Sequence, residues 1–148
     1  MKVLIVSIGI LLLFTEFMVF QSDMNRYIRT RDYITQAAWD CVDSMNNHIQ
    51  LDSESEAGRL SDEALINEEL ALWAETLNTR LRDTLTEPVE IDLELVDDSK
   101  IGLKSQITGQ IFKHPAVIVR MYAKTKEFFR LPVLTVTHIE KTVVFQPV

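Results

Sequence analysis

The chain has 148 residues, 47% of them hydrophobic, and its 22 acidic against 15 basic residues give a formal net charge of −7. This charge disfavours a sequence-independent grip on nucleic-acid phosphates, and the length suits one domain with a modest core. The single cysteine, Cys41, excludes an intrachain disulfide and a cysteine-based zinc site.

The amino-terminal segment 3–20, VLIVSIGILLLFTEFMVF, is apolar apart from one charge, Glu16. As a helix it would be about 27 Å long, close to the thickness of a bilayer's hydrocarbon core. Its thirteen Val, Leu, Ile and Phe side chains favour insertion by roughly 0.3–0.6 kcal/mol each, whereas one acidic residue costs about 3 kcal/mol. We therefore predict a transmembrane anchor over 1–21. The alternative is a cleaved secretory signal, but no small-x-small cleavage site follows the apolar run.

Two features of the sequence bear on the orientation of this anchor. Arg26, Arg29 and Arg31 follow the apolar run, whereas Lys2 precedes it, so the arginine count by itself favours a cytoplasmic body. A short basic start followed by an apolar run is, however, how signal-anchors commonly begin. We expect a single-pass protein of the cell membrane whose domain, residues 22–148, is extracytoplasmic.

Beyond the anchor the helical pattern continues, and we predict a helix over 22–50. Apolar residues recur mostly at steps of three and four, and no glycine or proline intervenes before Gly58. The stripe consists of Met24, Tyr27, Ile28, Ile34, Ala38, Cys41, Val42, Met45 and Ile49. Such a stripe packs on the chain's own domain, on sister subunits, or on both.

The second half of the chain predicts a small sheet preceded by a helix. Residues 51–60 are polar and acidic and indicate an exposed linker. A helix is predicted over 61–86, with Ser61 as its N-cap and Pro88 beyond its end. From there the apolar period changes to two, which predicts strands within 88–147.

Four antiparallel strands are expected in this region, around residues 89–95, 101–111, 116–124 and 133–145. Their apolar face would pack on the second helix and on the outer half of the first. The predicted fold class is therefore α+β, with a long transmembrane helix that continues outside, a second helix and a four-stranded antiparallel sheet.

Glu16 is the residue whose position most needs an explanation, because it lies inside the apolar helix, toward its outer end. One interpretation is that its side chain snorkels to the nearby interface. The other is that it contacts a cation or donor of a partner chain, since ionisable groups within membrane spans usually serve a site.

No catalytic, cofactor-binding or metal site is predicted. His48, His114 and His138 show neither HxxxH nor HExxH spacing, and the acidic linker lacks the ligand spacing of an EF-hand. Cys41 is expected to be a small core side chain. The chain contains no GxSxG and no glycine-rich phosphate loop with a lysine, so we expect neither enzymatic activity nor a cofactor or small-molecule substrate.

Segment 11–45, LLLFTEFMVFQSDMNRYIRTRDYITQAAWDCVDSM, resembles the amino-terminal segment of TadE-like pilins of the tight-adherence pilus and, more loosely, of type IV pilin-like proteins. The shared points are a glutamate and an aromatic residue in the apolar helix, an Arg- and Tyr-bearing turn, and an alanine pair. Here these are Glu16 and Phe17, the turn around Tyr27, and Ala37 with Ala38.

The resemblance implies a filament in which apolar helices form a central bundle and Glu16 meets a neighbour's amino terminus. Cleavage after Gly9, the nearest glycine, would make Glu16 the seventh residue, whereas the pilin pattern has it fifth. An unprocessed protein of this kind would be a minor component or an assembly factor.

We therefore predict a non-enzymatic, pilin-like structural subunit or an assembly component of a pilus or secretion system. It would contact membrane lipid and self-associate, or join other pilin-like subunits, at the cell surface if it enters a filament. The expected subunit contacts are Glu16, Phe17, Tyr27, Ile34, Ala38 and Met45. The alternatives are a single-pass accessory or binding module of another cell-envelope complex, and a tethered enzyme, which would need convergent polar residues in a pocket.

Overall fold

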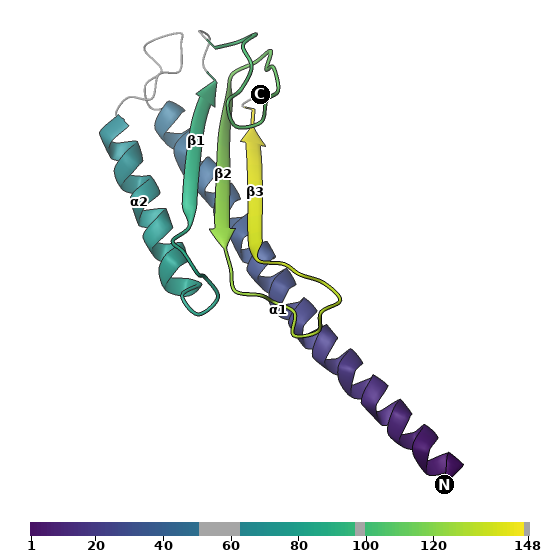
Figure 1. Cartoon of the computed structure of the whole chain (residues 1–148). Coiled ribbons are helices and arrows are strands. Elements are labelled where there is room, and N and C mark those ends of the chain that lie inside the picture. Colours follow the sequence, from purple (N-terminus) through teal and green to yellow (C-terminus); the bar gives the residue numbers. More distant parts are fainter. Residues whose placement is uncertain (51–62, 97–99, 147–148) are drawn as a thin grey trace.

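The structure is a computed structural model that describes residues 1–50, 63–96 and 100–146. The elements, in chain order, are α1 (Lys2–Gln50), α2 (Glu63–Arg80), β1 (Glu90–Val96), β2 (Ala116–Lys124) and β3 (His138–Phe145). The strands form one antiparallel sheet in the order β1-β2-β3, and the helices lie on one side of it (Figure 1). The α+β fold class is confirmed.

Helix α1 is a single helix of 49 residues, about 70 Å long at a rise of 1.5 Å per residue. It packs on the body from about Phe20 onward, and its amino-terminal part before Phe20, the projecting half, extends away from the body (Figure 1). Its most apolar 18-residue window has a mean hydropathy of 2.6, and none of that window is buried within the chain. Helix α1 is therefore long and apolar enough to cross a membrane.

The main core lies between the helices and one face of the sheet. Alternate residues of β2 (Val117, Val119, Met121 and Ala123) point toward the helices, as the period of two requires. They form one buried cluster with the stripe of α1, with Leu77 of α2, and with Ile139 and Val143 of β3. The two-layer packing expected from the sequence is confirmed.

The prediction of a fourth strand over 101–111 is wrong. This segment forms turns in which Gly102 and Gly109 have φ values of 81° and 71°, a conformation that side-chain-bearing residues rarely adopt. Its strand-like pairing is a single bridge between Lys104 and Ile111. Ile101 and Ile107 of this segment, together with Phe112 just beyond it, instead pack on Val96, Ala116 and Ile118 on the outer face of the sheet.

Two predicted boundaries also differ. The second helix ends at Arg80, not at residue 86, because the chain turns and Leu85 bridges to Thr125 beside the end of β2. Strand β3 begins at His138, not at residue 133. The predicted linker 51–60 and the start of the predicted second helix lie outside the described residues.

Candidate functional site

The structure divides the predicted contact residues between two parts of α1. Ile34, Ala38 and Met45 are all 0% exposed and belong to the chain's own core. Glu16 and Phe17 are exposed on the projecting half, with Phe17 56% exposed. At the first three positions the stripe thus packs on its own domain, whereas the other two side chains are accessible to another molecule.

Tyr27, the remaining predicted contact residue, is half-buried and marks a junction between α1 and the β2–β3 loop, residues 125–137. This loop leaves the end of the sheet and runs along α1 (Figure 1). The backbone N–H of Thr125 donates to the carbonyl of Thr137 at 2.8 Å, and that of Val136 donates to the Glu127 carboxylate at 3.0 Å. The loop is therefore closed at its neck and projects from there toward the amino-terminal half of α1.

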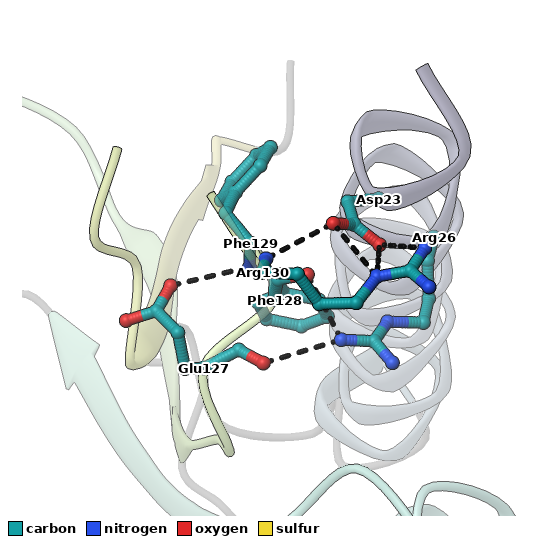
Figure 2. Close-up of polar contacts among 6 residues, drawn as sticks. All are labelled: Asp23, Arg26, Glu127, Phe128, Phe129 and Arg130. Atoms are coloured by element: carbon teal, nitrogen blue, oxygen red, sulfur yellow. Dashed lines mark hydrogen bonds and ion pairs between the residues drawn. The ribbon is translucent and has the colours of Figure 1, made fainter. Parts of the chain in front are cut away.

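An ion pair fixes the loop to the helix at Asp23 (Figure 2). Nε and Nη2 of Arg130 donate to Asp23 Oδ1 at 3.0 and 2.8 Å, and the Arg130 backbone N–H donates to Oδ2 at 3.0 Å. The Asp23 residue is 3% exposed. These side-chain and backbone hydrogen bonds from Arg130 hold the pKa of Asp23 below its ordinary value, despite its burial.

One turn further along α1, Arg26 holds the loop backbone. Its Nη2 donates to the carbonyl oxygens of Glu127 and Phe128 at 3.2 and 3.0 Å, and its guanidinium lies 5.4 Å from the centroid of the Phe128 ring (Figure 2). A cation over an aromatic face is attracted by the ring quadrupole. Arg26 thus satisfies two loop carbonyls and covers a buried ring at once.

Aromatic rings fill the space beneath these polar contacts. The rings of Phe20 and Phe129 stack with centroids 5.6 Å apart, and those of Tyr27 and Phe128 meet edge to face at 5.5 Å. Phe128 is 0% exposed. Because Phe20 is the last residue of the apolar run 3–20, the cluster lies where the projecting half of α1 meets the body.

This junction was not predicted, although the sequence of α1 carries a signal for it. Asp23, Tyr27, Thr30 and Ile34 follow one another at steps of four, three and four, so two polar residues occupy positions of the packing stripe. Both are buried. A buried polar group needs a partner, and for Asp23 that partner lies 107 residues away in sequence.

The depressed pKa of Asp23 predicts a dependence of stability on pH. A carboxyl group whose folded pKa lies below its unfolded value, near 4, stabilises the fold fully above about pH 5 and loses that effect as the pH falls through the folded pKa. In Asp23→Asn we expect a lower melting temperature at pH 7 and a smaller further decrease between pH 5 and pH 3 than in the parent. Thermal unfolding in detergent micelles, followed by circular dichroism, measures both quantities.

Asp32→Asn is the matched control, because the Asp32 side chain is 62% exposed and pairs with the adjacent Arg31. Such a pair contributes little to stability. A pH profile of Asp23→Asn that coincides with those of the parent and of Asp32→Asn would show that the Asp23 carboxylate does not hold the junction.

A second feature of the body is a groove of about 860 Å³ between α2, β1 and residues 103–107. Glu94 lies in it and accepts hydrogen bonds from Ser105 Oγ at 2.7 Å and from the backbone N–H groups of Gln106 and Ile107, both at 3.0 Å. Burial raises the pKa of Glu94, but these hydrogen bonds outweigh it, so that the pKa is lowered on balance. The carboxylate thus holds the segment that borders the groove.

Two observations bear on metal and thiol chemistry. Over residues 1–50, 63–96 and 100–146, no three His, Cys, Asp or Glu side chains gather to hold a metal ion. Cys41 is 0% exposed in the core, as predicted, and burial raises the pKa of its thiol to about 12.

The features that bear most on function are the projecting half of α1, with Glu16 and Phe17 exposed on it, and the junction that joins this helix to the body. Comparisons with protein-family models, with curated proteins and with solved structures found no match to this chain.

Proposed function

We propose that this protein is a non-enzymatic, membrane-anchored subunit or assembly component of a pilin-like filament or secretion system. Residues 1–21 cross the membrane, and the body, residues 22–148, lies on the extracytoplasmic side. The observation that carries the proposal is the projecting half of α1, whose most apolar window is entirely outside the chain's own core. Because exposing so much apolar surface to water is unfavourable, this helix requires lipid, other helices, or both.

The charge of Glu16 indicates that the projecting half of α1 contacts other helices as well as lipid. An unpaired carboxylate within a span costs about 3 kcal/mol, which a positive group of a neighbouring chain offsets. In the part of the chain that the structure describes, no hydrogen bond or ion pair reaches the side-chain carboxylate of Glu16. If Glu16 meets the amino terminus of a sister subunit, the two helices are staggered by about 22 Å, the rise over fifteen residues.

The junction supports a role in which a load passes between anchor and body. Asp23 and Arg26 on the helix bind Arg130 and the carbonyls of Glu127 and Phe128 on the loop. The contact therefore combines an ion pair, carbonyl hydrogen bonds and a buried ring over about one helical turn. In a subunit pulled through its helix, this contact would carry part of the load beside the core packing of α1.

Glu16→Leu tests the proposal. Without the carboxylate, insertion into the membrane should become more favourable, whereas incorporation into an assembly should fall by about tenfold or more, in the range of typical coupling between sites. The measurement is the amount of protein in sheared surface filaments relative to the membrane fraction of the native cells.

Thr15→Leu is the matched control, because it adds a leucine at the neighbouring position and keeps the charge. Equal recovery of Glu16→Leu and Thr15→Leu in the filament fraction would contradict the proposed contact. Recovery of the parent in the membrane fraction alone would favour an assembly component over a filament subunit.

A second candidate is a single-pass accessory or binding module of another cell-envelope complex. The observation that favours it is Trp39, which lies on α1 and is 47% exposed. Tryptophan is enriched among the residues that dominate binding at protein interfaces. Crosslinking in native membranes separates the candidates: a ladder of multiples of this chain indicates self-assembly, and one band of fixed composition indicates a heterologous complex.

A further inference from the structure

The tip of the β2–β3 loop is apolar and exposed. Residues 131–134 read Leu-Pro-Val-Leu, and Val133 and Leu134 are 76% and 43% exposed. Pro132 has no backbone N–H to satisfy, which lowers the cost of moving the tip out of water. An exposed apolar segment of this kind marks a surface that contacts another phase or molecule.

The tip lies beside the carboxy-terminal end of the proposed anchor, residues 1–21. Arg130, the residue before it, is bound to Asp23, and Phe129 stacks on Phe20 at 5.6 Å. Asp23 is three residues beyond Phe20, about 4.5 Å along the helix axis. Because Leu131 follows Arg130 directly, the tip begins at the level where the apolar run of α1 ends.

Cations flank this apolar tip. The Arg130 side chain is 64% exposed although it pairs with Asp23, and Arg26 and Arg29 are exposed on the same part of α1. Apolar side chains that enter the boundary between headgroups and acyl chains, with arginines at the level of the phosphates, are the usual composition of interfacial membrane contacts. The contact partner that suits both the apolar tip and the arginines beside it is the lipid surface that α1 is proposed to cross.

We propose that residues 131–134 insert into the lipid interface beside the anchor, so that the protein holds the membrane at two points, a span and a shallow loop. This inference rests on the proposed membrane anchor. The loop would set the depth and rotation of α1, because the tip is tied to the helix through Arg130 and Asp23.

Depth measurements with a spin label test the inference on the full chain. Nitroxide is attached to Val133→Cys, to Leu12→Cys in the anchor, and to Leu103→Cys. Leu103 is 61% exposed and lies in the connection between β1 and β2, which in this antiparallel sheet is at the end opposite the β2–β3 loop. The native Cys41 is 0% exposed, so the parent serves as the unlabelled blank. The proteins are reconstituted in vesicles of phosphatidylcholine and phosphatidylglycerol, and collisions with oxygen and with a water-soluble nickel chelate are compared.

The expected result is that positions 133 and 12 collide more with oxygen, whereas position 103 collides more with the chelate. A label at 133 that meets the chelate while position 12 is in lipid would overturn the loop contact and leave the anchor standing. Positions 133 and 12 both in water would overturn the anchor as well. A label at 133 that is shielded from both agents would show that protein, not lipid, covers the tip, and a label at Leu134→Cys repeats the test one residue on.

Discussion

Replacing Phe128 with alanine should destabilise the body by about 3–5 kcal/mol, the range for removal of a fully buried aromatic side chain. The Phe128 ring is 0% exposed, meets Tyr27 edge to face and lies under the guanidinium of Arg26. Since a whole domain is stable by about 5–15 kcal/mol, this loss is a large part of the total. Urea unfolding in micelles, followed by circular dichroism, measures it.

Phe14→Ala makes the same chemical change on the projecting half of α1, where the side chain is 60% exposed. We expect this variant to unfold at the urea concentration of the parent. Equal midpoints for Phe128→Ala and Phe14→Ala would mean that the junction contributes nothing to the stability of the body.

Replacing Leu12 with arginine should release most of the protein from the membrane. The thirteen Val, Leu, Ile and Phe residues of the apolar run favour insertion by about 4–8 kcal/mol in all, of which Glu16 offsets about 3 kcal/mol. An arginine near the middle of the span costs roughly 3 kcal/mol more and removes a leucine, so insertion becomes close to neutral or unfavourable. Alkaline carbonate extraction measures the fraction that stays with the membrane pellet.

Leu72→Arg is the control for the added charge. Leu72 is 62% exposed on α2, outside the anchor, so this variant should stay in the pellet like the parent. Retention of Leu12→Arg to the same extent would show that segment 3–20 is not what holds the protein in the membrane.

The elements with strong local periodicity were predictable from the sequence. Helix α1 has no glycine or proline between its apolar start and residue 50 apart from Gly9, and it is one helix. The apolar run Ala-Val-Ile-Val and the residues after it predicted β2 with its observed bounds, residues 116–124, because Pro115 marks its start. In both cases the signal lies within the element itself.

Segment 101–111 shows where local periodicity fails. Its apolar residues suggested a strand, but Gly102 and Gly109 turn the backbone. Ile101 and Ile107 pack on the sheet's outer face, and the segment does not pair along the edge of the sheet as a strand. Glu94 stabilises this arrangement by accepting hydrogen bonds from residues 105–107. Pairing partners of this kind are decided by tertiary contacts, which a single-sequence pattern does not contain.

The residues of the candidate site also differ in how far their roles could be predicted from the sequence. Glu16 was identified because a charge in an apolar run is conspicuous within a few residues of sequence. Ile34 and Ala38 were recognised as packing positions, but whether they face the chain's own sheet or a sister subunit depends on residues about 80–100 positions away. The pairing of Asp23 with Arg130 spans the same kind of distance, so neither residue stood out.

Because α1 is one continuous helix, the body follows any change in the orientation of the apolar run. Helix α1 runs through the junction as one helix, and Asp23 and Arg26 tie the β2–β3 loop to it there, so a tilt of the span turns the body through the same angle. Spans tilt by about 20° on average, and more when the hydrocarbon layer is thin. If segment 3–20 spans the membrane as proposed, such a tilt would move the far end of the body sideways by about 15 Å over the roughly 45 Å of helix that follows the span. With the proposed span, a change of a few ångströms in bilayer thickness would be converted into a much larger lateral displacement of the groove beside Glu94.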